Sequence, residues 1–333
     1  MQSMNSDYDY EEIRRKALQG PRVNSLIQRF ENIADGTAQV PGSDPAASAE
    51  FLSEDPEYRA YHNIFQRNIG TFYRHGCASI PFLIEENIRV GIALSRWAKL
   101  RHEHEEPPLT FYETSSADGS NARTLSEYSE GLIRTLTDSP NEANRMEFER
   151  LCTNEYSAFH KGPFVDITPE FLSTQHKYPY LGNKFDVIWE NTTFQMYGSN
   201  RIEQIAYVRR VLHEDGLMLF LEKMNHANTE EYRKREQIKD TEFKSRYFSP
   251  DELEAKKTGI LAEMEKGQVT LQEFIVALKR HFKVAYLIWN SANFYEIAAS
   301  NSEQTVRTFL DLLPEPSVPK NFIFETPMVR ALW

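Results

Sequence analysis

The hydrophobic pattern divides the chain into a helical part and a part in which strands and helices alternate. Apolar residues recur at helical spacing over residues 64–72 and 83–97, so we expect a helical region across residues 1–107. A polar stretch at residues 36–49 interrupts this region and is expected to form a mobile loop. Two prolines that follow residue 106 end the helical pattern, because proline cannot continue a helix.

Short apolar runs beyond this point predict the strands of a β-sheet. These runs are residues 109–112, 132–137, 164–167, 185–189 and 216–221. Amphipathic segments lie between them, for example residues 201–212, whose apolar side chains share one helical face. Alternating strands and helices predict an α/β fold with a parallel sheet covered on both faces.

A charged, helix-rich stretch at residues 226–280 interrupts this alternation. Two apolar runs at residues 284–289 and 294–298, separated by a short turn, then predict a β-hairpin. We therefore expect three parts, which are a helical N-terminal region at residues 1–107, an α/β domain at residues 108–300 that contains the insertion at residues 226–280, and a C-terminal helix with an extended tail at residues 301–333.

The composition restricts the partners and the compartment. The chain has 333 residues and a formal net charge of −11, which argues against broad electrostatic binding to nucleic acid. Cys77 and Cys152 lie far apart in the sequence and do not have the spacing of a metal site. The cluster of His102, His104 and Glu105 lacks a distant further ligand, so we expect a solvated turn and no metal. With no apolar leader and no apolar run of about 18 residues, we expect a cytoplasmic protein without a membrane partner.

The segment after the first predicted strand is the strongest candidate for a binding site. Glu113 ends the strand, small residues follow at alternate positions (Ser115, Ala117 and Gly119), and a helix begins near Ser120. Ligands of α/β sheets bind outside the carboxyl ends of the strands, and small residues let a ligand approach the backbone. The pattern therefore indicates a nucleotide-like ligand at this turn.

This segment resembles motif I of the class I S-adenosylmethionine (SAM)-dependent methyltransferases, in which glycines occupy the second, fourth and sixth positions after an acid. Only Gly119 of the three glycines remains, so we expect the backbone angles at Ser115 and Ala117 to differ from those of the family. The resemblance implies a doubly wound, mostly parallel, seven-stranded sheet with a terminal antiparallel hairpin. It also implies SAM as the cofactor.

The resemblance further implies which residues contact the cofactor. Asp138, at the end of the second strand, corresponds to the acid that binds both ribose hydroxyls. Asp166, which we expect to end the third strand, corresponds to the residue at the adenine amino group, and Phe164 to a residue beside the adenine ring. Glu190 and Asn191 follow the fourth strand and correspond to the positions near the methionine moiety. Each of these acids also has an ordinary structural interpretation as a capping or turn residue.

Methyl transfer requires a general base only when the acceptor must lose a proton. Glu190, Glu222 and His226 are the candidates, since each follows or ends a predicted strand of the site. The N-terminal helices are expected to form a lid, and residues 226–280 a cap over the substrate. An excess of basic residues at 231–247 either receives an anionic substrate or forms a solvated helix face.

We therefore predict a SAM-dependent methyltransferase that acts on a small-molecule acceptor by in-line displacement, with an anionic acceptor as one alternative. Two other functions stay open, an NAD-dependent oxidoreductase on a similar sheet and a non-catalytic nucleotide-binding module. The absence of a Gly-x-Gly-x-x-Gly turn disfavours the oxidoreductase. A homodimer through the tail and the N-terminal helices is compatible with the sequence.

Overall fold

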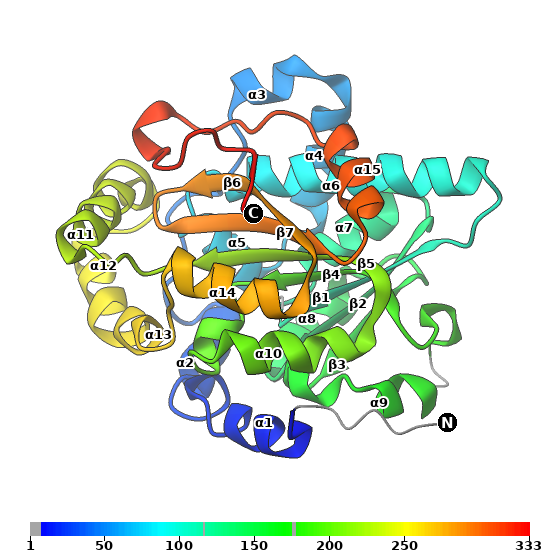
Figure 1. Ribbon diagram of the computed structural model, residues 1–333. Helices are drawn as coiled ribbons and strands as arrows, with labels where there is room; N and C mark the ends of the chain where they lie inside the picture. The colour runs from blue at the N-terminus through cyan, green and yellow to red at the C-terminus, as the bar shows by residue number, and fades with distance from the viewer. Residues whose placement is uncertain (1–7, 116, 175–177) are drawn as a thin grey trace.

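The computed structural model describes residues 8–115, 117–174 and 178–333, so the predictions for residues 1–7 lie outside the described part (Figure 1). A single sheet with the strand order β3-β2-β1-β4-β5-β7-β6-β8 runs through the molecule. Its strands are β1 (Leu109–Thr114), β2 (Ile133–Ser139), β3 (Ser157–Lys161), β4 (Phe185–Asn191), β5 (Leu212–Lys223), β6 (Val284–Ser291), β7 (Phe294–Ser300) and β8 (Arg330–Ala331).

The direction of the strands confirms the predicted fold class. Strands β1 to β5 pair in parallel, while β7 runs antiparallel to both β5 and β6. The central strands are buried on both faces, which is why their sequences are continuous apolar runs. The result is an α/β fold with a mostly parallel sheet and a terminal antiparallel hairpin.

The predicted number of strands was wrong, because the sheet has eight strands and not seven. The additional strand, β8, comes from the C-terminal tail and pairs antiparallel with β6 through Leu287–Arg330 and Tyr286–Ala331. The tail therefore covers the edge of β6, which would otherwise present unpaired backbone groups.

The predicted position of the third strand was also wrong. Strand β3 lies at Ser157–Lys161, and Phe164–Asp166 forms a 3-10 turn, η2. Edge strand β3 is only partly buried and has a polar sequence. Phe164 and Val165 are instead apolar because they are buried in the core, which produced a misleading strand pattern.

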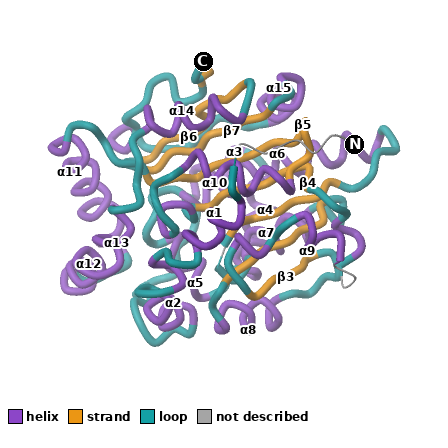
Figure 2. Tube along the Cα trace, turned by 60° about the horizontal axis from the view of Figure 1, so that its bottom comes forward, coloured by secondary structure: helices purple, strands orange, loops and turns teal. Residues whose placement is uncertain are grey.

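Helices cover both faces of the sheet (Figures 1 and 2). Helices α1, α10 and α14 share one hydrophobic core with the first face, and α4, α6, α7 and α15 share the other core with the second face. The helices are α1 (Tyr10–Ala17), α2 (Ile27–Ala34), α3 (Ala49–Glu54), α4 (Pro56–Asn68), α5 (Thr71–Cys77), α6 (Leu83–Glu103), α7 (Ser120–Tyr128), α8 (Glu142–Leu151), α9 (Pro169–Thr174), α10 (Arg201–Val208), α11 (Thr229–Ile238), α12 (Pro250–Lys256), α13 (Ala262–Glu265), α14 (Leu271–His281) and α15 (Glu303–Leu312).

The insertion between β5 and β6 is helical, as predicted, and its local sequence encodes its helix ends. Ser249 with Glu252, and Thr270 with Glu273, form capping boxes that start α12 and α14. Helices α11, α12 and α13 gather at one end of the sheet (Figure 1). Two π-helical turns, η6 (Lys239–Phe243) and η8 (Lys257–Leu261), interrupt this helical segment.

Candidate functional site

The loop after β1 keeps a left-handed backbone at each of the three small residues. The φ angles are 47° at Ser115, 57° at Ala117 and 72° at Gly119. Left-handed backbone favours glycine, and other residues adopt it at a cost. The expectation that Ser115 and Ala117 would abandon glycine-like angles is therefore wrong, since both remain in the left-handed region.

Asp138 anchors this loop to the end of β2. Its Oδ1 accepts hydrogen bonds from the Tyr112 hydroxyl at 2.6 Å and the Ser115 N–H at 2.9 Å, and its Oδ2 accepts from the Ser115 hydroxyl at 3.0 Å. The side chain is fully buried, and this burial raises the pKa of Asp138 to about 6. Asp138 is therefore an acceptor-rich group placed directly against the loop.

Glu113 connects the ends of β1 and β4. Its Oε1 accepts hydrogen bonds from the Asn191 amide at 3.0 Å and from the Asn121 amide at 3.3 Å. The same Asn191 amide donates to the Tyr73 hydroxyl at 3.3 Å. Glu113 and Asn191 thus meet, because β1 and β4 are parallel neighbours whose carboxyl ends lie side by side.

A small cavity of about 60 Å³ lies at these strand ends. Ser115 and Ala117 line it from the loop after β1, Asn191 from β4, Tyr73 from α5, and Arg22 from the N-terminal region. The structure therefore brings three of the predicted cofactor residues to one cavity. Glu113 and Asp138 hydrogen-bond two of those residues.

Arg22 is a site residue that the sequence analysis missed. It lies in a 3-10 turn, η1 (Pro21–Val23), is 1% exposed, and donates from Nη1 to the Asn141 Oδ1 at 2.6 Å. Within the part of the chain that the structure describes, its guanidinium forms no ion pair with a carboxylate. A single arginine outside any periodic pattern gives no sequence signal, because only the packing of the turn brings it to the cavity.

Asp118 joins the N-terminal helices to the loop. Its Oδ2 accepts from the Tyr73 N–H at 3.1 Å, and its Oδ1 accepts from the Ser120 N–H at 3.1 Å. It therefore caps α5 and α7 together. The Nη2 of the buried Arg123 lies 3.6 Å from the Asp118 Oδ1. The guanidinium also donates to the backbone carbonyls of Asp118 and Asn68.

Phe164 and Asp166 do not line this cavity. Phe164 packs in the core, with its ring 5.0 Å from that of Tyr197. Asp166 belongs to the turn η2 and not to a strand end, and its Oδ1 pairs with the Arg14 guanidinium at 2.8 Å. Neither residue lines the cavity beside Ser115, and their contact with adenine stays a prediction.

The three candidate bases occupy different surroundings. Glu190 Oε1 accepts from the backbone N–H groups of Thr193 and Phe194, and burial together with nearby Glu222 raises its pKa well above the usual range. Glu222 pairs with the Arg201 guanidinium at 2.7 Å, and burial raises its pKa as well. Half-buried His226 lies at the start of the insertion, where its Nδ1 contacts the backbone of Asn228.

A second cavity, of about 120 Å³, adjoins the first. The two share the lining residues Phe72, Gly76, Ile80, Thr192 and Met196. Four lysines line the second cavity, and they are Lys223, Lys239, Lys244 and Lys256. The basic run at residues 231–247 therefore separates into buried and exposed members, since Lys239 and Lys244 are buried while Arg233, Lys234 and Arg246 are exposed.

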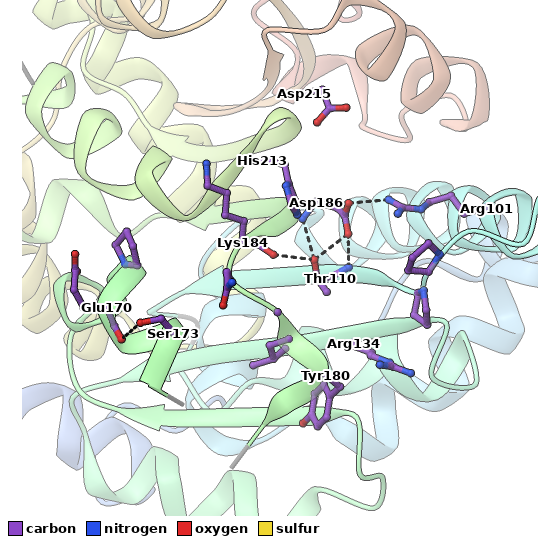
Figure 3. A pocket seen from close by; sticks show the side chains of 16 residues that line it. Arg101, Thr110, Arg134, Glu170, Ser173, Tyr180, Lys184, Asp186, His213 and Asp215 are labelled. Carbon is purple, nitrogen blue, oxygen red and sulfur yellow. Dashed lines mark hydrogen bonds and ion pairs between the residues drawn. The ribbon is translucent and has the colours of Figure 1, made fainter. Parts of the chain in front are cut away.

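A larger cavity, of about 940 Å³, lies at the opposite ends of the strands (Figure 3). It opens beside the amino ends of β1, β2 and β4, at Thr110, Arg134 and Asp186. Asp186 is fully engaged there, because its carboxylate accepts from Arg101 at 2.8 Å and from the Thr110 N–H at 2.8 Å. Ligands of α/β sheets bind at the carboxyl ends, so we assign the site to the two smaller cavities.

Comparison with known proteins finds remote similarity to solved structures. No family model matches the chain, and no curated protein matches it. Among solved structures, the plantazolicin methyltransferase BpumL in complex with an analog and SAH is 11% identical, with a TM-score of 0.47, over 88% of this chain and 98% of that one. The SAH-bound form of CalO1, a methyltransferase in calicheamicin biosynthesis, is 12% identical, with a TM-score of 0.41, over 89% of this chain and 74% of that one.

The strand directions agree with the fold class that the sequence predicts. The parallel strands β1 to β5, the antiparallel hairpin of β6 and β7, and the helices on both faces are what the resemblance in motif I implies.

None of the helices in the described residues has the length and the apolar character that a membrane span requires. The same residues contain no group of three or more His, Cys, Asp or Glu side chains arranged to hold a metal ion.

Proposed function

We propose that this protein is a methyltransferase that uses SAM to methylate a small-molecule acceptor. The observation that carries the proposal is the loop after β1, which keeps glycine-like angles at Ser115, Ala117 and Gly119 and lies against Asp138. A loop of this shape at a strand–helix turn lets a ligand approach the backbone. The strain at Ser115 and Ala117 points to function, since the chain keeps these angles without glycine.

The surrounding residues fit the chemical groups of SAM. An ionised carboxylate offers about four acceptor positions, and protein donors fill three at Asp138. The Ser115 hydroxyl would have to yield its bond to Oδ2 for Asp138 to hold two ribose hydroxyls. Arg22 supplies positive charge at the same cavity and would complement the cofactor's carboxylate.

The residues of this chain would then position the acceptor and exclude water. SAM supplies a methyl group on a sulfonium, which is transferred by in-line displacement. Catalysis of such a step depends mainly on alignment of the reactants in a dry cavity. We propose that Glu190 and Glu222 position the end of β4 and the end of β5, since Glu190 Oε1 accepts from backbone N–H groups and Glu222 pairs with Arg201.

The N-terminal segment and the insertion are proposed to close over the site as a lid and a cap. Ligand pockets usually measure about 300–1,000 Å³, whereas the two cavities measure about 60 and 120 Å³. The site must therefore enlarge to admit the cofactor. Arg22 and Tyr73 line the cavity from the N-terminal region, which supports an opening on that side.

Calorimetric titration with SAM and SAH tests the proposal, with Asp138→Asn as the variant and Asp186→Asn as the control. Asp186 is a carboxylate of the same sheet at the opposite ends of the strands. SAH should bind the wild type and the control alike, and bind Asp138→Asn about tenfold or more weakly, because hydrogen bonds to charged groups contribute about 1.5–3 kcal/mol. No binding by the wild type would overturn the proposal, and a parallel NADH titration then tests the oxidoreductase.

We also propose a cytoplasmic location. Cys77 and Cys152 are both free thiols, which is the usual state in a reducing compartment.

A further inference from the structure

Four buried lysines converge on the second cavity. Lys223 ends β5, Lys239 begins the first π-helical turn, Lys244 follows that turn, and Lys256 immediately precedes the second one. Each is at most 3% exposed. Lysine is almost never fully buried without a partner, and π-helical turns occur frequently at functional sites.

The carboxylates beside these lysines are too few to balance them. Glu236 Oε2 accepts from Lys223 at 2.8 Å and from Lys239 at 2.6 Å. Asp240 Oδ1 lies 3.0 Å from Lys244 and 3.5 Å from Lys239. Two carboxylates are therefore ion-paired with three of the lysines, and Lys256 is a fourth lysine beside them.

Lys256 has no acid partner among the residues that the structure describes. Its Nζ donates to the Ser79 hydroxyl at 2.7 Å and lies 4.1 Å from the centre of the Phe248 ring. Burial and the neighbouring lysines lower the pKa of Lys256 well below its usual range, and that of Lys244 to about 8. A buried ammonium without a counter-charge is costly, so an anion in this cavity would be strongly favoured.

We propose that this lysine pocket (Lys223, Lys239, Lys244 and Lys256) binds an oxyanion group, carboxylate or phosphate, of the methyl acceptor. The inference rests on the proposed function, since it takes the adjoining cavity as the place of the cofactor. Most of the other lining residues are apolar, among them Phe30, Ile33, Phe72, Ile80, Met196 and Ile260. The acceptor is therefore a small molecule with an apolar body and a negatively charged end.

The shared walls of the two cavities give the acceptor its orientation. Thr192 and Met196 line both cavities, while Ser115 and Asn191 line only the first and the lysines only the second. An acceptor whose charged end lies among the lysines would direct its apolar body past Thr192 and Met196 toward Ser115. The lysine pocket thus determines which end of the acceptor is presented for methylation.

Thermal unfolding with sodium phosphate and with sodium hexanoate tests the pocket, at an ionic strength held constant with sodium chloride. The variants are Lys244→Gln and Lys256→Gln. Lys266→Gln is the control, because Lys266 belongs to the same insertion but is 69% exposed. Lys256→Met is a further variant that keeps the length of the side chain and its packing. Calorimetry with SAH is carried out on every protein.

We expect at least one of the two anions to raise the Tm of the wild type and of Lys266→Gln, since a ligand that binds only the folded state stabilises it. The anion should bind about tenfold or more weakly to Lys244→Gln, Lys256→Gln and Lys256→Met, while SAH binds all of them. The head group is a phosphate if phosphate acts at the lower concentration, and a carboxylate if hexanoate does.

Two results would overturn the inference in distinguishable ways. If SAH binds but no anion raises the Tm, or if the anion acts equally on the lysine variants, the lysine pocket is not an anion site and the proposed function remains. If an anion binds through the lysines but SAH does not bind, the pocket is an anion site while its assignment to a methyl acceptor fails together with the proposed function.

Discussion

Ser115 and Asp138 are joined by two hydrogen bonds, from the Ser115 N–H to Oδ1 at 2.9 Å and from the Ser115 hydroxyl to Oδ2 at 3.0 Å. This pair holds the loop after β1 against the end of β2. Ser115 occupies the second position of the motif, and its hydroxyl makes a hydrogen bond to Asp138 that a glycine there could not make. The serine therefore compensates part of the strain of its own left-handed backbone.

The burial of Asp138 predicts a pH dependence of stability. Its pKa rises from 3.8 to about 6 in the folded state, so between these values the folded protein binds more protons than the unfolded chain. The contribution of Asp138 to the free energy of unfolding is therefore fully present at low pH and is lost as the pH rises through about 6. The expected loss is about 3 kcal/mol, because each unit of pKa difference corresponds to about 1.36 kcal/mol.

Asp138→Asn should remove this dependence. The asparagine can accept from Tyr112 and Ser115 through its carbonyl oxygen and donate to the Ser115 hydroxyl, so the fold is expected to persist. Urea unfolding at pH 4.5 and 7 measures the difference between wild type and variant. A stability difference that stays constant between the two pH values would show that Asp138 keeps an ordinary pKa in the folded protein.

Much of the fold was predictable because burial on both faces forces continuous apolar runs. The run at β4, where Val187, Ile188 and Trp189 are fully buried, is one example. Strand β3 was not predicted, because an edge strand needs few apolar residues, and its His160 is half-buried while its Lys161 is exposed. Strand β8 is too short for any period to be recognised.

The site was predictable only where strand ends determine it. Glu113 and Asn191 meet because parallel strands end at the same edge of the sheet, which follows from the order of the elements. Arg22 and Lys256 reach the cavities from distant segments through tertiary packing. Their burial opposes the usual preference of charged side chains, so no hydropathy pattern could indicate it.

Ala117→Gly should increase stability. Ala117 has a φ of 57°, and a left-handed backbone costs an L-residue roughly 1–2 kcal/mol relative to glycine. The greater entropy of glycine in the unfolded chain offsets about 0.5–1 kcal/mol of this gain. We expect a net stabilisation of up to about 1 kcal/mol in urea unfolding.

Ala122→Gly is the matched control for this substitution. Ala122 is also buried but lies within α7, where glycine should lower stability by about 1 kcal/mol. Equal destabilisation by the two substitutions would contradict a left-handed backbone at Ala117.

Asp118→Ala should be strongly destabilising. The substitution removes the acceptor for the Tyr73 and Ser120 N–H groups and leaves the buried Arg123 without its carboxylate. Removal of one partner of a buried ion pair costs about 3–5 kcal/mol.

Urea unfolding of Arg67→Ala provides the comparison for Asp118→Ala. Arg67 pairs with Glu127 at the surface, and 62% of its side chain is exposed. The comparison variant should lose about 1 kcal/mol or less. Similar losses in the two variants would show that Asp118 is not a shared cap.

Opening of the N-terminal segment predicts a change in hydrogen exchange on cofactor binding. The segment packs closely over the site, because a Cβ added at Gly20 would lie 2.8 Å from the Tyr197 Cα, and Arg22 closes the cavity beside Ser115. If cofactor entry requires α1 and α2 to separate from the sheet, their amides should exchange rapidly in the free protein and at least about tenfold more slowly with bound SAH, since the ligand stabilises the closed form.

The control for this measurement is α15, which packs on the opposite face of the sheet, lies outside both cavities and should show no change. Gly20→Val places a side chain against Tyr197 and should hold the segment open. This variant is expected to exchange rapidly at α1 and α2 and to bind SAH more weakly, while β4 keeps its protection. Tight SAH binding with unchanged exchange at α1 and α2 would mean that the cofactor enters by another route, most directly beneath the insertion, where Lys256 and Ile260 line the second cavity.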